Sequence, residues 1–169
     1  MAYDLDQIDQ TLLCYIQADA RLSNAELARR LDLSPTGLQK RLRKLEDAGV
    51  ITHYVTLVDR ESLGFDMLCF IQVTLQRHEL DAIHKFKSSI RAMPEVLECY
   101  HLTGEYDYLL KVVLQNRKHL EEFLMERLTP LPSMDKIRTS LVLNEIKSTT
   151  AMPLNIELGT NGSDPDRDV

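Results

Sequence analysis

The spacing of hydrophobic residues changes at Gly49. Before this position, apolar residues recur every three or four positions, which is the period of a helix with one buried face. This spacing predicts three helices: one over 5–18, a short one that starts after Ser23, and one that starts at Pro35. Between 50 and 58 the residues are mostly β-branched or aromatic, which favours two short strands that form a wing beside the helices.

Capping residues mark the ends of the second and third predicted helices. Ser23 can accept a backbone N–H of the first turn, and Glu26 three residues later completes a capping box. Ser34 is placed to cap the next helix, and Pro35 follows at its first position, where a missing N–H costs nothing. Gly49 comes at the end, where a left-handed C-cap favours glycine. The two helices are therefore expected to be joined by a tight turn.

A second pattern follows the wing. It predicts a strand, a helix, two strands, a helix and a strand over the ranges 67–76, 80–93, 96–103, 108–114, 120–128 and 137–146. This order, βαββαβ, is the split arrangement of ferredoxin-like domains. Such a domain leaves one face of its sheet open. The many apolar residues on these strands predict that another subunit covers that face.

The predicted fold class is therefore α+β, with a winged helix-turn-helix followed by a ferredoxin-like βαββαβ domain. The helix-turn-helix domain covers 1–58, the linker 59–66 and the ferredoxin-like domain 67–154. We expect Met152 to Leu154 to dock on the folded part. The composition of 155–169, rich in charged and turn-forming residues, predicts a disordered tail.

The side of the third helix that lies opposite its leucines is basic and polar. Lysine and arginine neutralise phosphates, and arginine and glutamine can also reach base edges in the major groove. A leucine-anchored helix with such a face fits the second helix of a DNA-binding helix-turn-helix. The alternative is an ordinary surface helix with a solvated basic face. The tight turn and the Ser-Pro start favour double-stranded DNA as the partner, with contacts from Ser34, Thr36, Gly37, Gln39, Lys40, Arg41, Arg43 and Lys44.

The formal charge of the 169-residue chain is −6, which is unusual for a DNA-binding protein. The field at the DNA depends on where the charges lie, and the densest basic cluster is on the third helix. The acidic excess lies elsewhere, including Asp6 and Asp9 near the start, which we expect to face water. Net charge therefore does not exclude DNA binding.

Cysteine and histidine usage argues against disulfides and metal sites. Cys14, Cys69 and Cys99 are widely spaced in apolar-periodic segments, which predicts buried thiols in a reducing compartment. The five histidines show no metal-ligand spacing, so no metal and no cofactor are expected. The chain contains no signal peptide and no apolar run long enough to span a bilayer, which predicts a cytoplasmic protein without membrane contact.

The two motifs occur in the order found in the leucine-responsive regulatory protein/AsnC family of transcription regulators, which the chain resembles. The stretches that carry the resemblance are LDQIDQTLL, RLSNAELARRLDLSPTGLQKRLRKLEDAGVI, PEVLECYHLTGEYDYLLKV and NEIKSTTAMPL. The resemblance implies a regulator that binds DNA as a homodimer, assembles further, often to octamers, and binds an amino acid or related small molecule. Gly37 is a departure, because many relatives carry a larger residue there. Glycine lowers helix propensity by about 1 kcal/mol relative to alanine.

The resemblance also implies an effector site between dimers, near the loop after the second strand. That loop contains Leu102, Thr103, Gly104, Glu105, Tyr106 and Asp107. Glycine permits close approach of backbone to a ligand, loop amides can hold a carboxylate, and Asp107 can accept bonds from an ammonium group. The ligand's side chain is expected against Thr139, Ser140 and Leu141 of a neighbouring dimer. The alternative is a plain hairpin turn.

Two other classes of function remain open from the sequence. Some relatives with this layout resemble sirohaem decarboxylases, which use histidines of the second domain, and His101 lies beside the candidate loop. The intact basic face of the third helix argues against an enzyme. No serine or cysteine nucleophile has a base nearby in the sequence. The third class is an effector-binding domain that only tethers other proteins.

Overall fold

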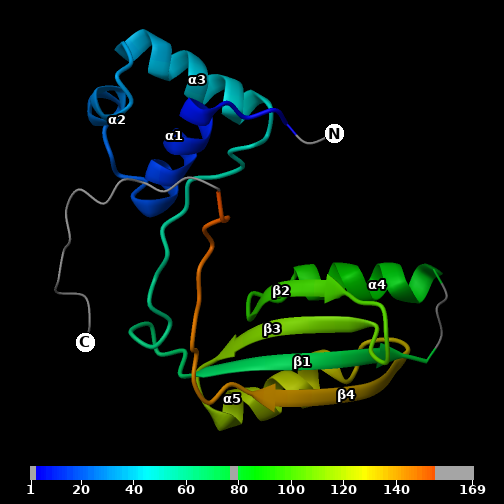
Figure 1. Cartoon of the computed structure of the whole chain (residues 1–169). Helices are drawn as coiled ribbons and strands as arrows, with labels where there is room; N and C mark the ends of the chain where they lie inside the picture. Colours follow the sequence, from blue (N-terminus) through cyan, green and yellow to red (C-terminus); the bar gives the residue numbers. More distant parts are fainter. Residues whose placement is uncertain (1–2, 77–79, 155–169) are drawn as a thin grey trace. The chain divides into compact units, whose positions relative to one another are not determined.

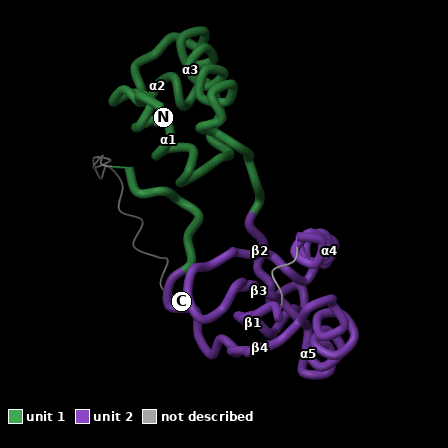
Figure 2. Tube along the Cα trace, turned by 90° about the vertical axis from the view of Figure 1, so that its right-hand side faces the viewer, with its two compact units in different colours: residues 1–56, 148–169 green, residues 57–147 purple. Residues whose placement is uncertain are grey.

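The computed structural model describes residues 3–76 and 80–154, and the expected disordered tail lies outside these residues. The chain folds into two compact units (Figure 2), one made of 1–56 and 148–169 and the other of 57–147. In chain order (Figure 1), the elements are α1 (Gln7–Ala18), α2 (Asn24–Arg30), α3 (Pro35–Asp47), β1 (Met67–Leu75), α4 (Leu80–Arg91), β2 (Val96–His101), β3 (Tyr108–Leu114), α5 (Arg117–Glu122), the π-helix η1 (Phe123–Leu128) and β4 (Met134–Leu141).

The first unit is built from the three predicted helices. Its core contains Leu12, Leu13, Leu27, Ala28, Leu38 and Leu45. The predicted caps form: the Ser23 Oγ accepts the Glu26 N–H at 3.2 Å, and the Ser34 Oγ accepts the Gly37 N–H at 3.1 Å. Gly49 follows the C-cap of α3 with a φ of +69°, a backbone conformation that favours glycine. The local signals in the sequence therefore correctly identified these helix ends.

Three expectations for these helices were wrong in detail. The Glu26 carboxylate bonds Arg29 and Arg30, so its described bonds do not close the reciprocal half of a capping box. Asp9 does not face water, since only 2% of it is exposed. Helix α1 also begins two residues later than predicted, because Asp6 is its N-cap and accepts the Asp9 N–H at 2.7 Å.

The two strands expected over 50–58 do not form. The N–H groups of Val50 and Ile51 both donate to the Leu45 carbonyl, at 2.9 and 3.1 Å. Residues 52–59 then run without regular secondary structure, and Tyr54 and Val55 are exposed. A strand needs a hydrogen-bonding partner, and no described segment of the chain pairs with this one.

The second unit has the predicted βαββαβ order. Its antiparallel sheet has the strand order β2-β3-β1-β4, and α4 and α5 lie on one face of it (Figures 1 and 2). Alternate residues of β1 point into this layer and pack with α4 and η1 around Phe86 and Phe123. Helix α5 starts at Arg117, earlier than the predicted residue 120, because Asn116 caps it. Strand β4 runs from Met134 to Leu141, so it begins and ends earlier than predicted, and the Val142 N–H that follows it still donates to the Leu68 carbonyl.

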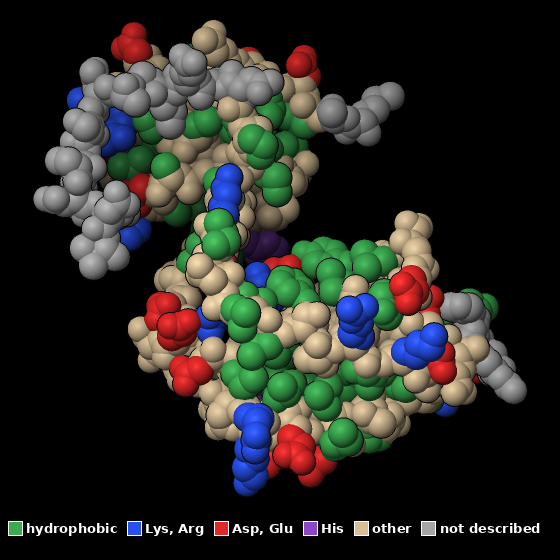
Figure 3. Space-filling model, turned by 60° about the horizontal axis from the view of Figure 1, so that its bottom comes forward, with side chains coloured by type: hydrophobic (Ala, Val, Ile, Leu, Met, Phe, Trp, Pro, Cys, Tyr) green, Lys and Arg blue, Asp and Glu red, His purple; other side chains and the backbone are tan. Residues whose placement is uncertain are grey.

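The face of the sheet opposite the helices mixes apolar and charged side chains. On this face, Phe70 lies between Lys111 and Ser140, and Leu109 pairs with Tyr100. Tyr100 is half exposed, and Phe70 and Leu109 are partly so. Figure 3 shows hydrophobic side chains gathered on the surface of the second unit, with charged side chains around them. No helix in the described part of the chain covers this face.

The three cysteines are free but not equally buried. Cys69 is buried in the core of the second unit, Cys14 is half-buried and Cys99 is exposed. The expectation of three buried thiols was therefore wrong for Cys99. It lies on β2, an edge strand of the sheet, where α4 covers only part of the surface.

The segment 148–154 returns to the first unit and docks on α1. The Gln17 side-chain amide bonds the backbone of Met152 in both directions: Oε1 accepts the N–H at 2.6 Å, and Nε2 donates to the carbonyl at 3.3 Å. Leu154 packs against the helical core. The expected docking of Met152 to Leu154 is therefore confirmed. By its contacts this segment groups with the first unit, whereas the sequence analysis counted it with the ferredoxin-like domain.

Gln17→Ala is expected to lower the free energy of unfolding of the first unit by about 1 kcal/mol, because two hydrogen bonds in a partly exposed setting are lost. Urea denaturation followed by helical circular dichroism measures this change. Gln7→Ala is the matched control, since it removes an exposed glutamine from the same helix. Equal stability of the two variants would show that the docked segment contributes nothing.

Candidate nucleic-acid interface and effector loop

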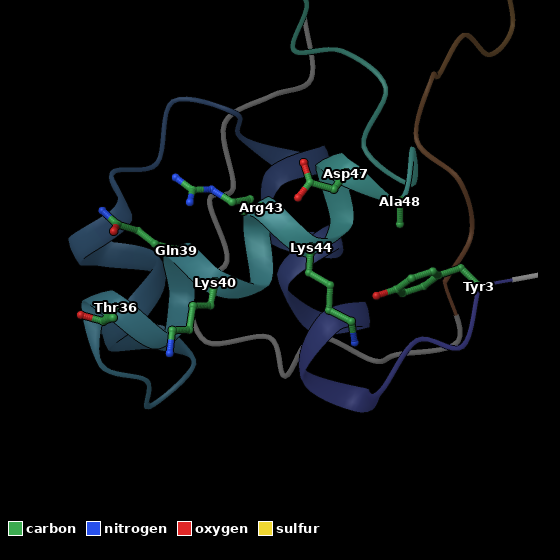
Figure 4. Close-up of a pocket in the computed structure, with 8 residues that line it drawn as sticks. All are labelled: Tyr3, Thr36, Gln39, Lys40, Arg43, Lys44, Asp47 and Ala48. Atoms are coloured by element: carbon green, nitrogen blue, oxygen red, sulfur yellow. The ribbon is translucent and has the colours of Figure 1, made fainter.

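The outward face of α3 is an exposed row of polar and basic side chains. Thr36, Gln39, Lys40, Arg43 and Lys44 are all exposed and line an open groove of about 620 Å³ (Figure 4). On the opposite side of the helix, the buried leucines anchor it in the core. The structure therefore brings together five of the eight residues predicted for DNA contact.

Ser34 and Gly37 lie in the first turn of α3, at its cap. A Cβ on Gly37 would come within 3.1 Å of the Ser34 Oγ, which accepts the Gly37 N–H. A contact this short would displace the Ser34 hydroxyl from the position in which it caps the helix. Glycine therefore leaves the cap undisturbed, and this offsets its lower helix propensity.

Tyr3 is part of this groove, although nothing in the sequence pattern indicated it. The Lys44 Nζ lies 5.4 Å from the centre of the Tyr3 ring, and the neighbouring tyrosine raises the pKa of Lys44. Lys44 therefore remains charged at neutral pH. Asp47 also lines the groove and supplies a single negative charge at the C-terminal end of the helix.

Arg41 turns away from this face and into the protein. Its Nη1 donates to the Asp6 Oδ2 and to the Asp9 Oδ1, each at 2.6 Å. The Arg41 side chain is 28% exposed and that of Asp9 is 2% exposed. The guanidinium therefore ties α3 to the start of α1 and satisfies a buried carboxylate. The structure does not place Arg41 with the other predicted DNA contacts.

Acid is expected to destabilise the first unit. Bonds from Arg41 lower the pKa of Asp6, and bonds from Arg29 and Arg30 lower that of Glu26 from its ordinary 4.5 to about 2. A carboxylate with a lowered folded-state pKa stabilises the fold above its ordinary pKa, and this contribution is lost as the pH falls. The melting temperature should therefore fall as the pH is lowered from about 5 to 2. The melting temperature of the Glu26→Gln variant should fall less steeply over this range. An equal slope for the variant and the parent would show that Glu26 does not contribute to the acid sensitivity.

The predicted effector loop, 102–107, joins β2 to β3 and is tied to β1. The Leu102 N–H donates to the Asp107 carbonyl at 2.8 Å, and the Asp107 N–H donates to the Val73 carbonyl at 3.0 Å. The Asp107 Oδ2 accepts the Leu75 N–H at 2.8 Å. Gly104 has a φ of +134°, which requires glycine. Asp107 therefore has a structural bond that the sequence did not indicate.

One residue of β4 contacts this loop, whereas Leu141 of the same strand lies away from it. Arg138, which the sequence analysis missed, donates from Nη1 to the Tyr106 hydroxyl at 3.3 Å. Thr139, Ser140 and Leu141 lie farther along the strand. Tyr108, at the end of the loop, pairs with Val73, whereas Leu141 pairs with Cys69. Val73 and Cys69 are four residues apart on β1, which corresponds to about 13 Å along the strand. A single chain therefore does not bring Leu141 to the loop.

Two family models match this chain. Residues 5–52 match the winged helix-turn-helix DNA-binding model, and residues 68–152 match the Lrp/AsnC ligand-binding domain. The second match spans half of the chain. The chain belongs to the Lrp/AsnC family of transcriptional regulators. The predicted family and the predicted α+β fold class are thereby confirmed.

Individual relatives are similar to this Lrp/AsnC regulator over most of its length. The leucine-responsive regulatory protein of Escherichia coli (strain K12) is 36% identical over 149 residues, which cover 88% of this chain and 91% of that protein. Transcriptional regulator AzlB of Bacillus subtilis is 33% identical over 155 residues, covering 92% and 99%. A transcriptional regulator from Neisseria meningitidis, solved as a complex with L-Met, has a TM-score of 0.86 and 39% identity, covering 90% of this chain and 98% of that one.

Over 3–76 and 80–154, no three His, Cys, Asp or Glu side chains are grouped so that they could hold a metal ion. The His101 ring stacks on Tyr108, with 4.9 Å between the ring centres. None of the described helices is long and apolar enough to cross a membrane.

Proposed function

We propose that this member of the family is a sequence-specific DNA-binding transcription regulator whose DNA binding or assembly responds to an amino acid or related small molecule. The observation that carries the proposal is the outward face of α3, where five exposed groups capable of base or phosphate contact follow one another along one helix. The match of 5–52 to a winged helix-turn-helix model supports the use of this face on DNA. A protein that regulates chromosomal genes in this way acts in the cytoplasm.

The residues on this face take different roles on DNA. Arg43 and Gln39 lie at its centre and contact base edges, because arginine reads guanine and glutamine reads adenine in the major groove. Lys40 and Lys44 flank them and neutralise phosphates. Thr36 contacts the backbone near the start of the helix, where the Ser34 cap and Gly37 bring it close to the DNA. Arg41 takes no part, since its guanidinium is bound to Asp6 and Asp9.

The protein works as a homodimer that assembles further to an octamer. The uncovered sheet face of the second unit, with Phe70, Leu109 and Tyr100 on it, supports a dimer interface there. Two DNA-binding units in a two-fold dimer read half-sites about one helical turn apart, or a multiple of it. Family resemblance supports the octamer of four dimers.

The effector is an amino acid that binds beside the loop 102–107. Loop amides hold its carboxylate, and the Asp107 carboxylate accepts from its ammonium group. Thr139, Ser140 and Leu141 of a second dimer contact its side chain; the distance between Leu141 and the loop within one chain is consistent with a contribution from another chain. The L-Met complex of the Neisseria relative supports this class of ligand. A site made by two dimers couples ligand binding to assembly.

Binding of genomic DNA fragments by the full-length protein, with and without a panel of amino acids, tests the function. Retention of particular fragments, altered by at least one amino acid, is the expected result. A protein that retains all fragments equally, or none, is not a sequence-specific regulator. Light scattering of the same samples reports whether the amino acid changes the assembly.

Asp107→Asn is expected to abolish the amino-acid response while DNA affinity without ligand stays within about twofold of the parent. The asparagine Oδ1 can still accept the Leu75 N–H, so the loop remains attached to β1. The charge that pairs with the ammonium group is lost. Fluorescence anisotropy with and without the amino acid measures the DNA affinity of the free protein and the change that the amino acid causes.

Asp135→Asn is the matched control, because it removes an exposed carboxylate from β4 of the same unit. It should respond to the amino acid like the parent. A normal response in Asp107→Asn would remove Asp107 from the site. Loss of DNA binding without ligand would show that its charge has a structural role.

A further inference from the structure

A second cavity lies in the ferredoxin-like unit, where it is lined by residues of α4 and of the edge strand β2. Its volume is about 430 Å³, within the range of small-molecule sites. Lys87, Ile90 and Arg91 line it from α4, and Val96, His101 and Tyr108 line it from the strands. It is separate from the face of α3 and from the loop amides of the proposed effector site.

The cavity carries two cations without a protein counter-charge. Lys87 and Arg91 are one helical turn apart and exposed, and neither forms an ion pair within the described part of the chain. The lining also includes Glu98, but its carboxylate accepts from the Tyr100 hydroxyl at 2.6 Å and from the Lys111 Nζ at 3.3 Å. The cavity is therefore positive, although the chain as a whole is acidic.

Tyr108 contributes a hydroxyl that has no partner among the described residues. Its side chain is 3% exposed, and its ring lies against Phe86 at 4.5 Å and His101 at 4.9 Å between centres. Burial, followed by the charge of Asp107, raises the pKa of Tyr108, so the hydroxyl stays protonated and can donate. Tyr108 lines the cavity, so its hydroxyl can donate to a ligand oxygen that takes the place of water.

The lining also includes apolar side chains, from Ile90, Val96 and Leu97, and the Cys99 thiol. Ile90 is buried in the core and Val96 is half-buried at the start of β2. An aliphatic group on them would leave water, while an acidic group on the same molecule reached the cations at the rim. The cavity therefore combines an apolar floor, a positive rim and one hydrogen-bond donor.

We propose that this cavity binds a small aliphatic carboxylate that lacks an ammonium group, of the α-keto acid class. Arg91 and Lys87 hold the carboxylate, Tyr108 donates to the keto oxygen, and the aliphatic body lies on Ile90 and Val96. An amino acid fits less well, because its ammonium group would lie beside two cations while Glu98 is already bound. The site therefore selects the deaminated counterpart of an amino acid.

The position of this site gives it a way to affect regulation. His101 directly precedes the loop 102–107 and Tyr108 directly follows it. A ligand that contacts both residues holds the two ends of the loop that the proposed function assigns to the amino-acid effector. The cavity itself stands on observations independent of that assignment.

Isothermal titration of the full-length protein with ketoisocaproate, the keto acid of leucine, tests the site. The parent should bind the keto acid, and Arg91→Gln and Lys87→Gln should each weaken binding at least about tenfold, because each removes a charge-assisted hydrogen bond. Lys85→Gln is the matched control: it removes an exposed cation of α4 that does not line the cavity, and it should bind like the parent. Tyr108→Phe should weaken binding without lowering the melting temperature, since its hydroxyl bonds no described residue.

Three outcomes would overturn the proposal. The first is no binding of ketoisocaproate by the parent at millimolar concentration. The second is an equal loss in Lys85→Gln and Arg91→Gln, which would indicate nonspecific attraction to a basic helix. The third is loss of keto-acid binding in Asp107→Asn with normal binding in Arg91→Gln, which would place the keto acid at the effector loop instead.

Discussion

Replacing Arg41 with alanine should lower the free energy of unfolding of the DNA-binding unit by about 3 kcal/mol. Its guanidinium is the partner of the buried Asp9 carboxylate, and the same Nη1 bonds Asp6, the N-cap of α1. Without Arg41, Asp9 is left charged and only 2% exposed. The expected loss is at the low end for a broken buried pair, because Arg41 and Asp6 are partly exposed.

Urea denaturation followed by circular dichroism measures the loss. Lys40→Ala is the matched control, since it removes the exposed cation that precedes Arg41 on the same helix. Its stability should stay within about 0.5 kcal/mol of the parent. The double variant Arg41→Met/Asp9→Leu should regain much of the stability, because apolar groups replace the buried pair. Equal stability of Arg41→Ala and Lys40→Ala would mean that the ion pair does not hold α3 to α1.

Arg43→Ala should weaken binding to the specific site by about 1–3 kcal/mol per half-site and relax the sequence preference at one base pair. A dimer contains two copies of the residue, so the combined effect on a full site should exceed that on a half-site. The stability of the protein should not change, because Arg43 is exposed and makes no ion pair with a described residue. Fluorescence anisotropy with a specific and a scrambled duplex, at several salt concentrations, measures affinity and preference together.

Lys44→Ala provides the comparison for Arg43. A phosphate contact carries no sequence information, so both duplexes should lose affinity alike and the dependence on salt should become less steep. If both variants bound the specific duplex like the parent, α3 would not lie in the major groove as proposed. If Arg43→Ala lost affinity for both duplexes equally, Arg43 would contact phosphate rather than a base.

Local patterns predicted much of this chain correctly. Ser34 and Gly49 mark the ends of α3 because capping depends on atoms within a few residues of each other. The order of strands and helices along the second unit followed from the alternation of apolar runs and helical periods. Prediction failed at 50–58, where β-branched composition favours strands but the described chain offers no partner strand. Strand formation depends on residues far away, whereas a helix satisfies its own backbone.

The same distinction between local and long-range interactions separates the parts of the candidate sites that were predicted from those that were not. The outward positions of α3 followed from helical spacing and the buried leucine stripe, because one helix decides which side chains share a face. Arg41 belongs to the same helix, yet its position at the margin of the stripe did not reveal its role. Only the packing of α1 against α3 brings Asp6 and Asp9 to its guanidinium.

The sequence by itself determined the three N-terminal helices with the caps of α2 and α3, the order of strands and helices along the second unit, the basic face of α3 and the family. These features depend on neighbouring residues or on motifs that keep their order along the chain. Only the tertiary structure decided that Asp107 bonds the backbone of β1, that Gln17 binds the returning segment at Met152, and that α4 and β2 enclose a positive cavity. Each of these joins residues far apart in the chain, and no periodic pattern records which distant residues the fold will place within hydrogen-bonding distance.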